Sequence, residues 1–242
     1  MQCKKALILA AGLGTRLAPI TNDKPKCLVP VNGKPILFKQ IDNLKLNGIE
    51  DITIVSGYKA EILEMTVREK YPGVNVIESV DYATTNNMYS AYLGIKSMFP
   101  DGIIAPFYMM NADVFFDASV ITALERLDEG NYVVVDQGRY IEESMKVIER
   151  AGRLIGISKT ITHEEALGCS IDVYKFGEGG GKAFFDRCCD YIEIKKELKK
   201  WSEVALNDAF ADAVFQVCPL DGRWLEIDNH EDLAAAEALF KE

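Results

Sequence analysis

Short apolar runs alternate with longer segments in which apolar residues recur every three or four positions over the first 136 residues. The short runs are wholly apolar or rich in β-branched residues, as expected of central strands that are covered on both faces. This alternation predicts an α/β fold with a doubly wound, mostly parallel sheet. The predicted strands are residues 5–9, 51–56, 74–78, 104–110 and 132–136.

Three helices are predicted between these strands. Pro35 can start the first and Gly48 can end it, with apolar residues on one face in between. The second runs from about residue 86 to just before residue 100, and the third follows residue 119.

The pattern changes after residue 136, where strands follow one another more closely. We predict a hairpin turn at "ERAGR", a loop leading into a helix at "GEGGGKAFFDRCCDYI", and a final helix over about residues 230–241 with Asn229 as its N-cap. The sequence therefore predicts a single domain, residues 1–242, whose second half adds antiparallel strands. These later strands are residues 145–149, 154–157, 169–176, 214–217 and 224–226.

The charge of the chain argues against two classes of partner. With 37 acidic and 27 basic residues, the formal net charge is −10, which disfavours nucleic acid and anionic membranes. No apolar run approaches the roughly 20 residues that span a bilayer. The six cysteines show no C-x-x-C spacing and the two histidines lie far apart, so we expect reduced thiols in a cytoplasmic protein rather than a zinc site.

A glycine-rich loop follows the first predicted strand. Ala11, Gly12 and Gly14 allow backbone N–H groups to approach a triphosphate, Arg16 can grip phosphate oxygens, and Lys26 adds a compact charge. A plain strand-to-helix turn is the alternative. The fingerprints G-x-G-x-x-G and G-x-x-x-x-G-K-[ST] are both absent, which excludes a dinucleotide-binding loop and a P-loop.

An aspartate, Asp113, follows the predicted strand at residues 104–110, where nucleotide phosphates would lie in such a sheet. A carboxylate among phosphates requires a cation between them, and Mg²⁺ prefers one or two carboxylates together with phosphate oxygens. Taken alone, an aspartate at this place is more often a cap or a turn residue.

The segment "AAGLGTRLAPITNDKPKCLVPVNGKPIL" resembles the signature of the nucleotidyltransferases that make nucleoside-diphosphate sugars and alcohols. This resemblance implies a Rossmann-like, GT-A-like nucleotidyltransferase fold, with residues 1–136 as the nucleotide-binding half and residues 137–242 as the acceptor-binding half. It implies that Arg16 and Lys26 are catalytic and stabilise the triphosphate. It also implies a Mg²⁺ cofactor held by Asp113 and by Asp228 of "LEIDNHEDL". Asn111 departs from the D-x-D form of the family.

A second segment, "DYATTNNMYSAYLGI", resembles the "Y-A-x-x-N-N-x-Y-S-x-Y" of bacterial choline-phosphate cytidylyltransferases. The resemblance implies CTP as the nucleotide, although a capped amphipathic helix is the alternative for this segment. The nucleotide-binding residues that we predict are Leu9, Ala10, Ala11, Gly12, Gly14, Thr15, Arg16, Lys26, Gly57, Tyr82, Asn87, Ser90 and Ala112.

Acceptor contacts are predicted from two later segments that resemble the same branch. Lys146 of "SMKV" would contact a phosphate or phosphonate, while Glu203 and Trp201 of "WSEVALNDAF" would hold a substrate ammonium. A surface helix face is the alternative for Trp201 and Glu203. The segment "IEESMKV" supplies no tryptophan for an aromatic cage, and a primary amine would need carboxylates more than aromatic rings.

These expectations combine into a Mg²⁺-dependent cytidylyltransferase. It would transfer CMP from CTP to a small phosphorylated or phosphonate amino alcohol of the phosphocholine, phosphoethanolamine or 2-aminoethylphosphonate type, with release of pyrophosphate. The alternatives are a sugar-1-phosphate nucleotidyltransferase and a catalytically inactive nucleotide-sensing module. A homodimer is compatible with this interpretation.

Overall fold

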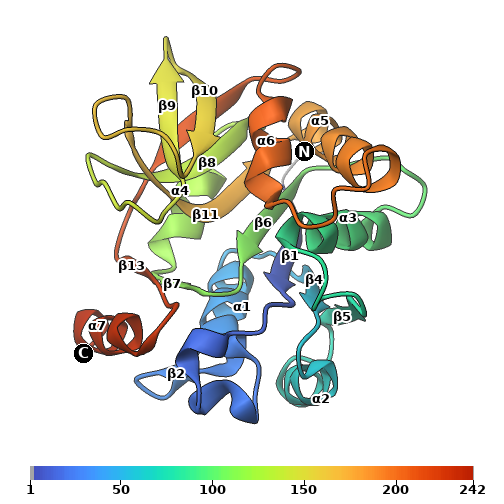
Figure 1. Ribbon diagram of the computed structural model, residues 1–242, viewed down its shortest axis with the longest axis vertical. Helices are drawn as coiled ribbons and strands as arrows, with labels where there is room; N and C mark the ends of the chain where they lie inside the picture. The colour runs from blue at the N-terminus through green and yellow to red at the C-terminus, as the bar shows by residue number, and fades with distance from the viewer. Residues whose placement is uncertain (1–2, 242) are drawn as a thin grey trace.

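Four parallel strands form the centre of a nine-stranded sheet in the computed structural model, which describes residues 3–241. They are β1 (Lys5–Ala10), β4 (Asp51–Ser56), β5 (Asn75–Glu78) and β6 (Phe107–Asn111). Their order across the sheet is β6-β1-β4-β5, so the chain winds outwards from β1 in both directions (Figure 1). The predicted parallel core is confirmed, with each boundary within three residues.

The remaining strands of the sheet extend it beyond β6. Strand β11 (Gly168–Phe176) pairs along one edge with β8 (Asn131–Gln137). Along its other edge it pairs with β6 near its end and, near its start, with β9 of the hairpin of β9 and β10; all three pairings are antiparallel. Strand β12 (Phe215–Pro219) then pairs in parallel with β8. The hairpin, β9 (Lys146–Arg150) and β10 (Arg153–Ser158), turns at Ala151 and Gly152, both with positive φ, as the "ERAGR" motif predicted.

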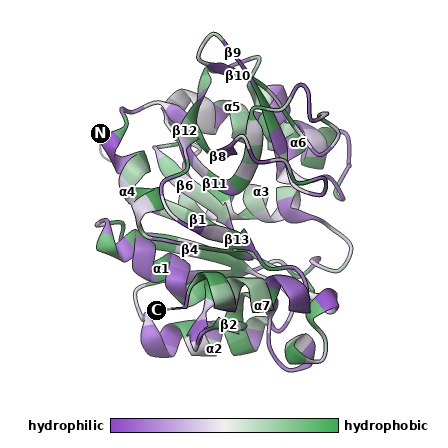
Figure 2. Ribbon diagram, turned by 90° about the vertical axis from the view of Figure 1, so that its left-hand side faces the viewer, coloured by the Kyte–Doolittle hydropathy of each residue, from purple (hydrophilic) through white to green (hydrophobic). Residues whose placement is uncertain are grey.

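Helices cover both faces of the sheet, because alternate side chains of the buried strands are apolar on both sides. Figure 2 shows the apolar strands enclosed between helices whose polar residues lie outside. One face packs against α1 (Ile36–Leu46), α2 (Ala60–Lys70) and α4 (Ser119–Arg126). The other packs against α3 (Asn87–Met98), α5 (Glu178–Cys189) and α6 (Ser202–Ala209). A turn of π-helix, η4 (Asp190–Ile194), follows α5.

A third, smaller core joins the glycine-rich loop to the C-terminal segment. There β13 (Trp224–Glu226) pairs with β7 (Val114–Phe116), and α7 (His230–Leu239) packs beside the short strands β2 (Pro30–Val31) and β3 (Lys34–Pro35). Asn229 caps α7 with its side chain, in a capping box with Asp232, so the predicted N-cap is confirmed. This arrangement brings the chain after β13 next to the chain after β6.

Helix α2 has no counterpart among the predicted helices. Its N-cap is Lys59 in a left-handed conformation, with no capping side chain, so the usual start signal is missing. All six cysteines are free thiols. Within residues 3–241, no helix is long and apolar enough to cross a membrane.

Candidate active site

The glycine-rich loop leaves β1 at the carboxyl edge of the parallel strands and turns sharply at Gly14. Gly14 has φ +62°, and a Cβ atom on it would lie 2.7 Å from Cβ of Lys26. Glycine is therefore required both by the backbone conformation and by the close approach of Lys26. The hydroxyl of Thr21 donates to the carbonyl of Gly14 at 2.9 Å and holds the turn.

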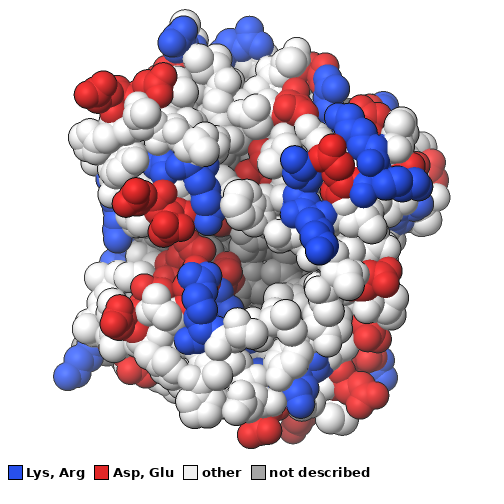
Figure 3. Space-filling model, in the orientation of Figure 1, with Lys and Arg blue, Asp and Glu red and all other residues white. Residues whose placement is uncertain are grey.

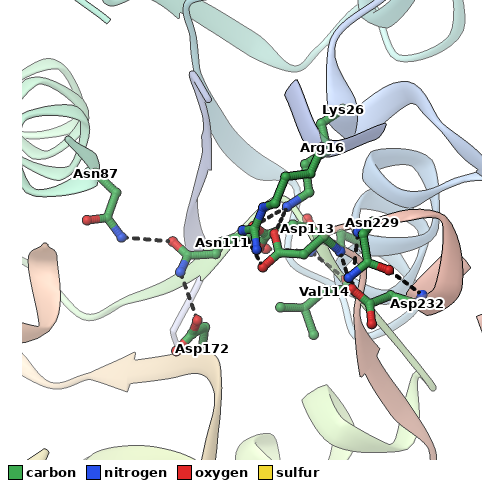
Figure 4. Close-up of polar contacts among 11 residues, drawn as sticks. Arg16, Lys26, Asn87, Asn111, Asp113, Val114, Asp172, Asn229 and Asp232 are labelled. Atoms are coloured by element: carbon green, nitrogen blue, oxygen red, sulfur yellow. Dashed lines mark hydrogen bonds and ion pairs between the residues drawn. The ribbon is translucent and has the colours of Figure 1, made fainter. Parts of the chain in front are cut away.

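Two cations and two carboxylates meet beside this loop (Figure 4). The ammonium of Lys26 lies 2.8 Å from Oδ2 of Asp113 and 2.6 Å from Oδ1 of Asp228. Arg16 donates to the other oxygen of Asp228 at 2.7 Å. Burial alone would lower the pKa of Lys26, but the charges of Asp113 and Asp228 outweigh it and raise the pKa above its ordinary value. Lys26 is thus a fixed positive charge in this site.

A third carboxylate, Glu226 of β13, completes an acidic centre with these two aspartates. Ligand atoms of Asp113, Glu226 and Asp228 lie within 4.8 Å of one another. Burial, followed by the charges of Asp113, Asp172 and Asp228, raises the pKa of Glu226 to about 9. Oδ1 of Asp113 is buried and has no hydrogen-bond partner among the described residues. An unsatisfied buried oxygen in a set of carboxylates fits a hard divalent cation such as Mg²⁺.

Backbone hydrogen bonds around β7, β13 and α7 hold Asp113 and Asp228 next to each other. Asp113 follows β6 and precedes β7, and its carbonyl accepts from the N–H of Ile227 at 2.9 Å. The backbone N–H of Asp228 donates to Oδ2 of Asp232 at 2.9 Å, so the capping box of α7 also orients this residue. The pairing of β7 with β13 thereby sets the distance between the carboxylates.

A cavity of 380 Å³ extends from this charged centre towards α3 and α6. Figure 3 shows the hollow in the middle of the face, with acidic and basic side chains adjoining along its edge. Most of the predicted site residues line it, from both the nucleotide set and the acceptor set. They are Leu9, Ala11, Gly12, Gly14, Thr15, Arg16, Lys26, Tyr82, Asn87, Ser90, Asp113, Trp201, Glu203 and Asp228.

Three predicted nucleotide-binding residues shape the cavity from behind rather than lining it. Ala10 and Ala112 are buried, and Ala112 donates its N–H to the carbonyl of Leu9 at 3.0 Å. A Cβ atom on Gly57 would lie 2.6 Å from Cβ of Tyr82 and 2.7 Å from the carbonyl oxygen of Ala11. Gly57 therefore lets two cavity-lining segments approach each other.

The prediction for Lys146 is corrected. Its side chain is fully buried at the start of β9, and its ammonium donates to the carbonyl of Glu142 at 2.6 Å. Lys159, which follows β10, lines the cavity instead, with Nζ 5.0 Å from the centre of the Trp201 ring. Lys159, after the second strand of the hairpin, therefore faces the cavity, whereas Lys146, on the first strand, is buried in the protein.

Further cavity residues were not predicted, among them Glu226, Asn111 and Asp172. Asn111 donates to Asp172 at 3.0 Å and lies 3.5 Å from Nδ2 of Asn87 (Figure 4). Glu226 stands two residues before Asp228 in "LEIDNHEDL" and could have been found from that segment. Asp172 carried no such signal, because "CSIDVYKF" has the pattern of an ordinary strand.

Comparison with known proteins identifies the family of the chain. The model of the family "Nucleotidyl transferase" matches residues 5–142. Over 250 aligned residues, 98% of each chain, the protein is 53% identical to a choline-phosphate cytidylyltransferase of Streptococcus pneumoniae. Over 90 residues, 37% of this chain and 36% of the relative, it is 42% identical to a 2-aminoethylphosphonate cytidylyltransferase of Lancefieldella rimae.

A solved structure of the CTP:phosphocholine cytidylyltransferase LicC from Streptococcus pneumoniae has the same fold, with a TM-score of 0.81 and 29% sequence identity. The match covers 98% of this chain and 99% of that one. The glycine-rich loop, the two ion-paired aspartates and these matches lead to one conclusion: the chain belongs to the nucleotidyl transferase family and is a nucleotidyltransferase.

Proposed function

We propose that the protein transfers CMP from CTP to a small phosphorylated or phosphonate amino alcohol and releases pyrophosphate. The observation that carries this proposal is one cavity lined both by Arg16, Lys26 and their paired carboxylates and by Trp201 and Glu203. The names of the relatives support cytidylyl transfer and favour an amino alcohol over a sugar phosphate.

The reaction requires no protein nucleophile. An oxygen of the acceptor phosphate or phosphonate attacks the α-phosphorus of CTP, the bond to the bridging oxygen breaks, and pyrophosphate leaves with the electron pair. Arg16 and Lys26 would neutralise charge on the triphosphate, while the N–H groups of the loop orient it. Asn87 and Ser90, both at the start of α3, would contact the base or ribose.

Asp113, Asp228 and Glu226 would hold the Mg²⁺ ion. When bound, the cation would neutralise the phosphate oxygens and withdraw charge from the reacting phosphorus. Lys26 donates to one oxygen of each aspartate, and its positive charge offsets the mutual repulsion of the two carboxylates.

The acceptor end carries its own charged groups. Lys159 is the cavity-lining cation from the second half of the chain, and it would pair with the acceptor phosphate in place of Lys146. Glu203 is the carboxylate that would face the amino group, as predicted, with Trp201 beside it.

A pyrophosphate-release assay tests this proposal. CTP, UTP, GTP and ATP would each be combined with phosphocholine, phosphoethanolamine, 2-aminoethylphosphonate and glucose 1-phosphate in the presence of Mg²⁺. We expect turnover with CTP and an amino-alcohol acceptor, and none after addition of EDTA. Turnover with glucose 1-phosphate alone would favour the sugar-phosphate alternative, and nucleotide binding without turnover would favour the sensing module.

Two further expectations go with this function. A cytoplasmic location and a homodimer stay predictions, to be checked by fractionation of the source cells and by light scattering of the purified protein.

A further inference from the structure

Two carboxylates that line the cavity, Asp172 and Glu203, lie outside the set of Asp113, Glu226 and Asp228. Asp172 comes from β11, where the register with β8 shifts between Ser170 and Tyr174 and Asp172 itself has φ +57°. A left-handed conformation at a residue other than glycine costs free energy, and bulges beside functional sites redirect side chains. Here the bulge brings the carboxylate of Asp172 to the cavity. We call Asp172 and Glu203 the carboxylate pair.

The carboxylate pair shares one bridging donor. The hydroxyl of Tyr174 lies 2.9 Å from Oδ1 of Asp172 and 3.1 Å from Oε1 of Glu203. A hydroxyl donates one proton, so Tyr174 donates to only one of these oxygens at a time. The hydroxyl of Ser202 also donates to Oε1 of Glu203 at 3.1 Å, and Asn111 donates to Oδ2 of Asp172 at 3.0 Å. Burial, followed by the charge of Glu203, raises the pKa of Asp172 to about 8. The two groups therefore oppose each other electrostatically in the free protein.

Neither member of the carboxylate pair is held in an ion pair by a lysine or arginine of the described part of the chain. The ion pairs formed within residues 3–241 include none with Asp172 or Glu203. Glu203 is only 3% exposed, and its Oε2 atom has no hydrogen-bond partner among the described residues. A buried carboxylate oxygen that lines a cavity without a partner costs free energy unless a ligand supplies a donor.

The lining favours N–H donors over methyl groups in that ligand. Two aromatic side chains line the cavity, Tyr82 and Trp201, and Lys159 lies 5.0 Å from the Trp201 ring centre. A trimethylammonium group has no N–H donor and is bound by aromatic faces, whereas a primary ammonium has three donors. On the basis of the proposed function, we infer that Asp172 and Glu203 determine specificity for an acceptor with a primary ammonium group.

A methylation series tests the inference on the native enzyme. Phosphoethanolamine, its N-methyl and N,N-dimethyl derivatives, and phosphocholine carry the same phosphate ester, and each step of the series replaces one N–H donor by a methyl group. With CTP and Mg²⁺ we expect kcat/KM to fall along the series, by about tenfold or more in total. Propyl phosphate, which has no amine, should be poorer than phosphoethanolamine by at least about 30-fold. Equal or rising kcat/KM towards phosphocholine would overturn the inference while leaving cytidylyl transfer intact.

Two variants then assign the effect to the carboxylate pair. Asp172→Asn and Glu203→Gln should each lower the ratio of kcat/KM for phosphoethanolamine to that for propyl phosphate by about tenfold or more. The KM for CTP should be unchanged. Glu142→Gln removes the same charge from an exposed position and should leave that ratio unaltered. An unchanged ratio in both pair variants, with the proteins folded, would contradict the assignment.

A binding measurement keeps the inference separate from turnover. Calorimetry with a non-hydrolysable α,β-methylene analogue of CTP and Mg²⁺ would compare the affinities of phosphoethanolamine and phosphocholine. We expect phosphoethanolamine to bind at least about tenfold more tightly. Absence of turnover with every acceptor would contradict the proposed function. Equal affinities for phosphoethanolamine and phosphocholine in this measurement would independently contradict the role of the carboxylate pair in specificity.

Discussion

Asp113 accepts a hydrogen bond from Lys26 through one carboxylate oxygen, and its other oxygen is buried and has no hydrogen-bond partner among the described residues. Asp113→Asn removes the charge but keeps the shape. We expect kcat to fall by about a hundredfold or more and Mn²⁺ binding, followed by electron paramagnetic resonance, to weaken. The melting temperature should change little, and exposed Asp23→Asn is the matched control. Full activity in Asp113→Asn would refute the metal assignment.

Gly57 is a second decisive residue, although it does not line the cavity. In Gly57→Ala the new methyl group would clash with Tyr82 and with the carbonyl of Ala11. We expect a loss of about 1–3 kcal/mol in the free energy of unfolding. The KM for CTP should also rise, because both displaced segments line the nucleotide end.

The matched control for this change is Gly73→Ala, where an added Cβ atom meets nothing within 4 Å. Denaturant unfolding and nucleotide titration measure the two effects. Equal behaviour of the two alanine variants would show that the close approach at Gly57 is unimportant.

Single residues also show what the sequence could and could not predict. Arg16, Lys26, Asp113 and Asp228 lie in a long specific motif or at the end of a strand, and the structure brings them into contact. Lys146 lies in a short segment at the start of β9. Which side chains of β9 are buried depends on its pairing with β11, and that pairing joins segments that are distant in the sequence. For the same reason Asp172 could not be predicted as a site residue, because it reaches the cavity only through a bulge in the pairing of β11 with β8.

At the scale of elements, α7 links the fold to the site through its capping box. Asn229→Ala removes the side-chain acceptor of two N–H groups and should cost about 1 kcal/mol of stability. Because Asp232 of the same box holds the N–H of Asp228, affinity for the divalent cation should decrease as well.

The control for this change is Asn229→Ser, which retains a capping oxygen and should restore most of both properties. Thermal unfolding and Mn²⁺ titration check them separately. A stable Asn229→Ala variant with weakened Mn²⁺ binding would show that the box serves mainly to position Asp228. Loss of neither property would contradict the role of the cap.

Elements with strong periodicity or clear end signals were predicted well. The central parallel strands are rich in buried apolar residues, and Pro35 and Asn229 mark helix starts that the structure contains. Helix α2 lacks an N-cap side chain and was missed. Strand β8 was placed correctly, but its antiparallel pairing with β11 could not be deduced, because pairing partners depend on contacts between distant segments.

At the scale of the whole molecule, packing should protect the thiols. Five of the six cysteines are buried, and burial raises the pKa of the half-buried sixth, Cys189, to about 11. Since the thiolate is the reactive form, the native protein should react slowly with Ellman's reagent at pH 8, with at most one thiol per chain modified within minutes. In guanidinium chloride all six should react. Rapid modification of several thiols in the native protein would contradict the described packing.

The pairing of β13 with β7 has a consequence for how the enzyme is synthesised. Lys26 and Asp228 are in contact although 202 positions separate them in the chain. A nascent chain can form β1 and the glycine-rich loop early, but its acidic centre forms only when residues 224–228 have left the ribosome and joined β7. A translation product that stops before residue 224 would thus keep the loop and lack Asp228. The acidic centre therefore forms later in synthesis than the glycine-rich loop that it adjoins.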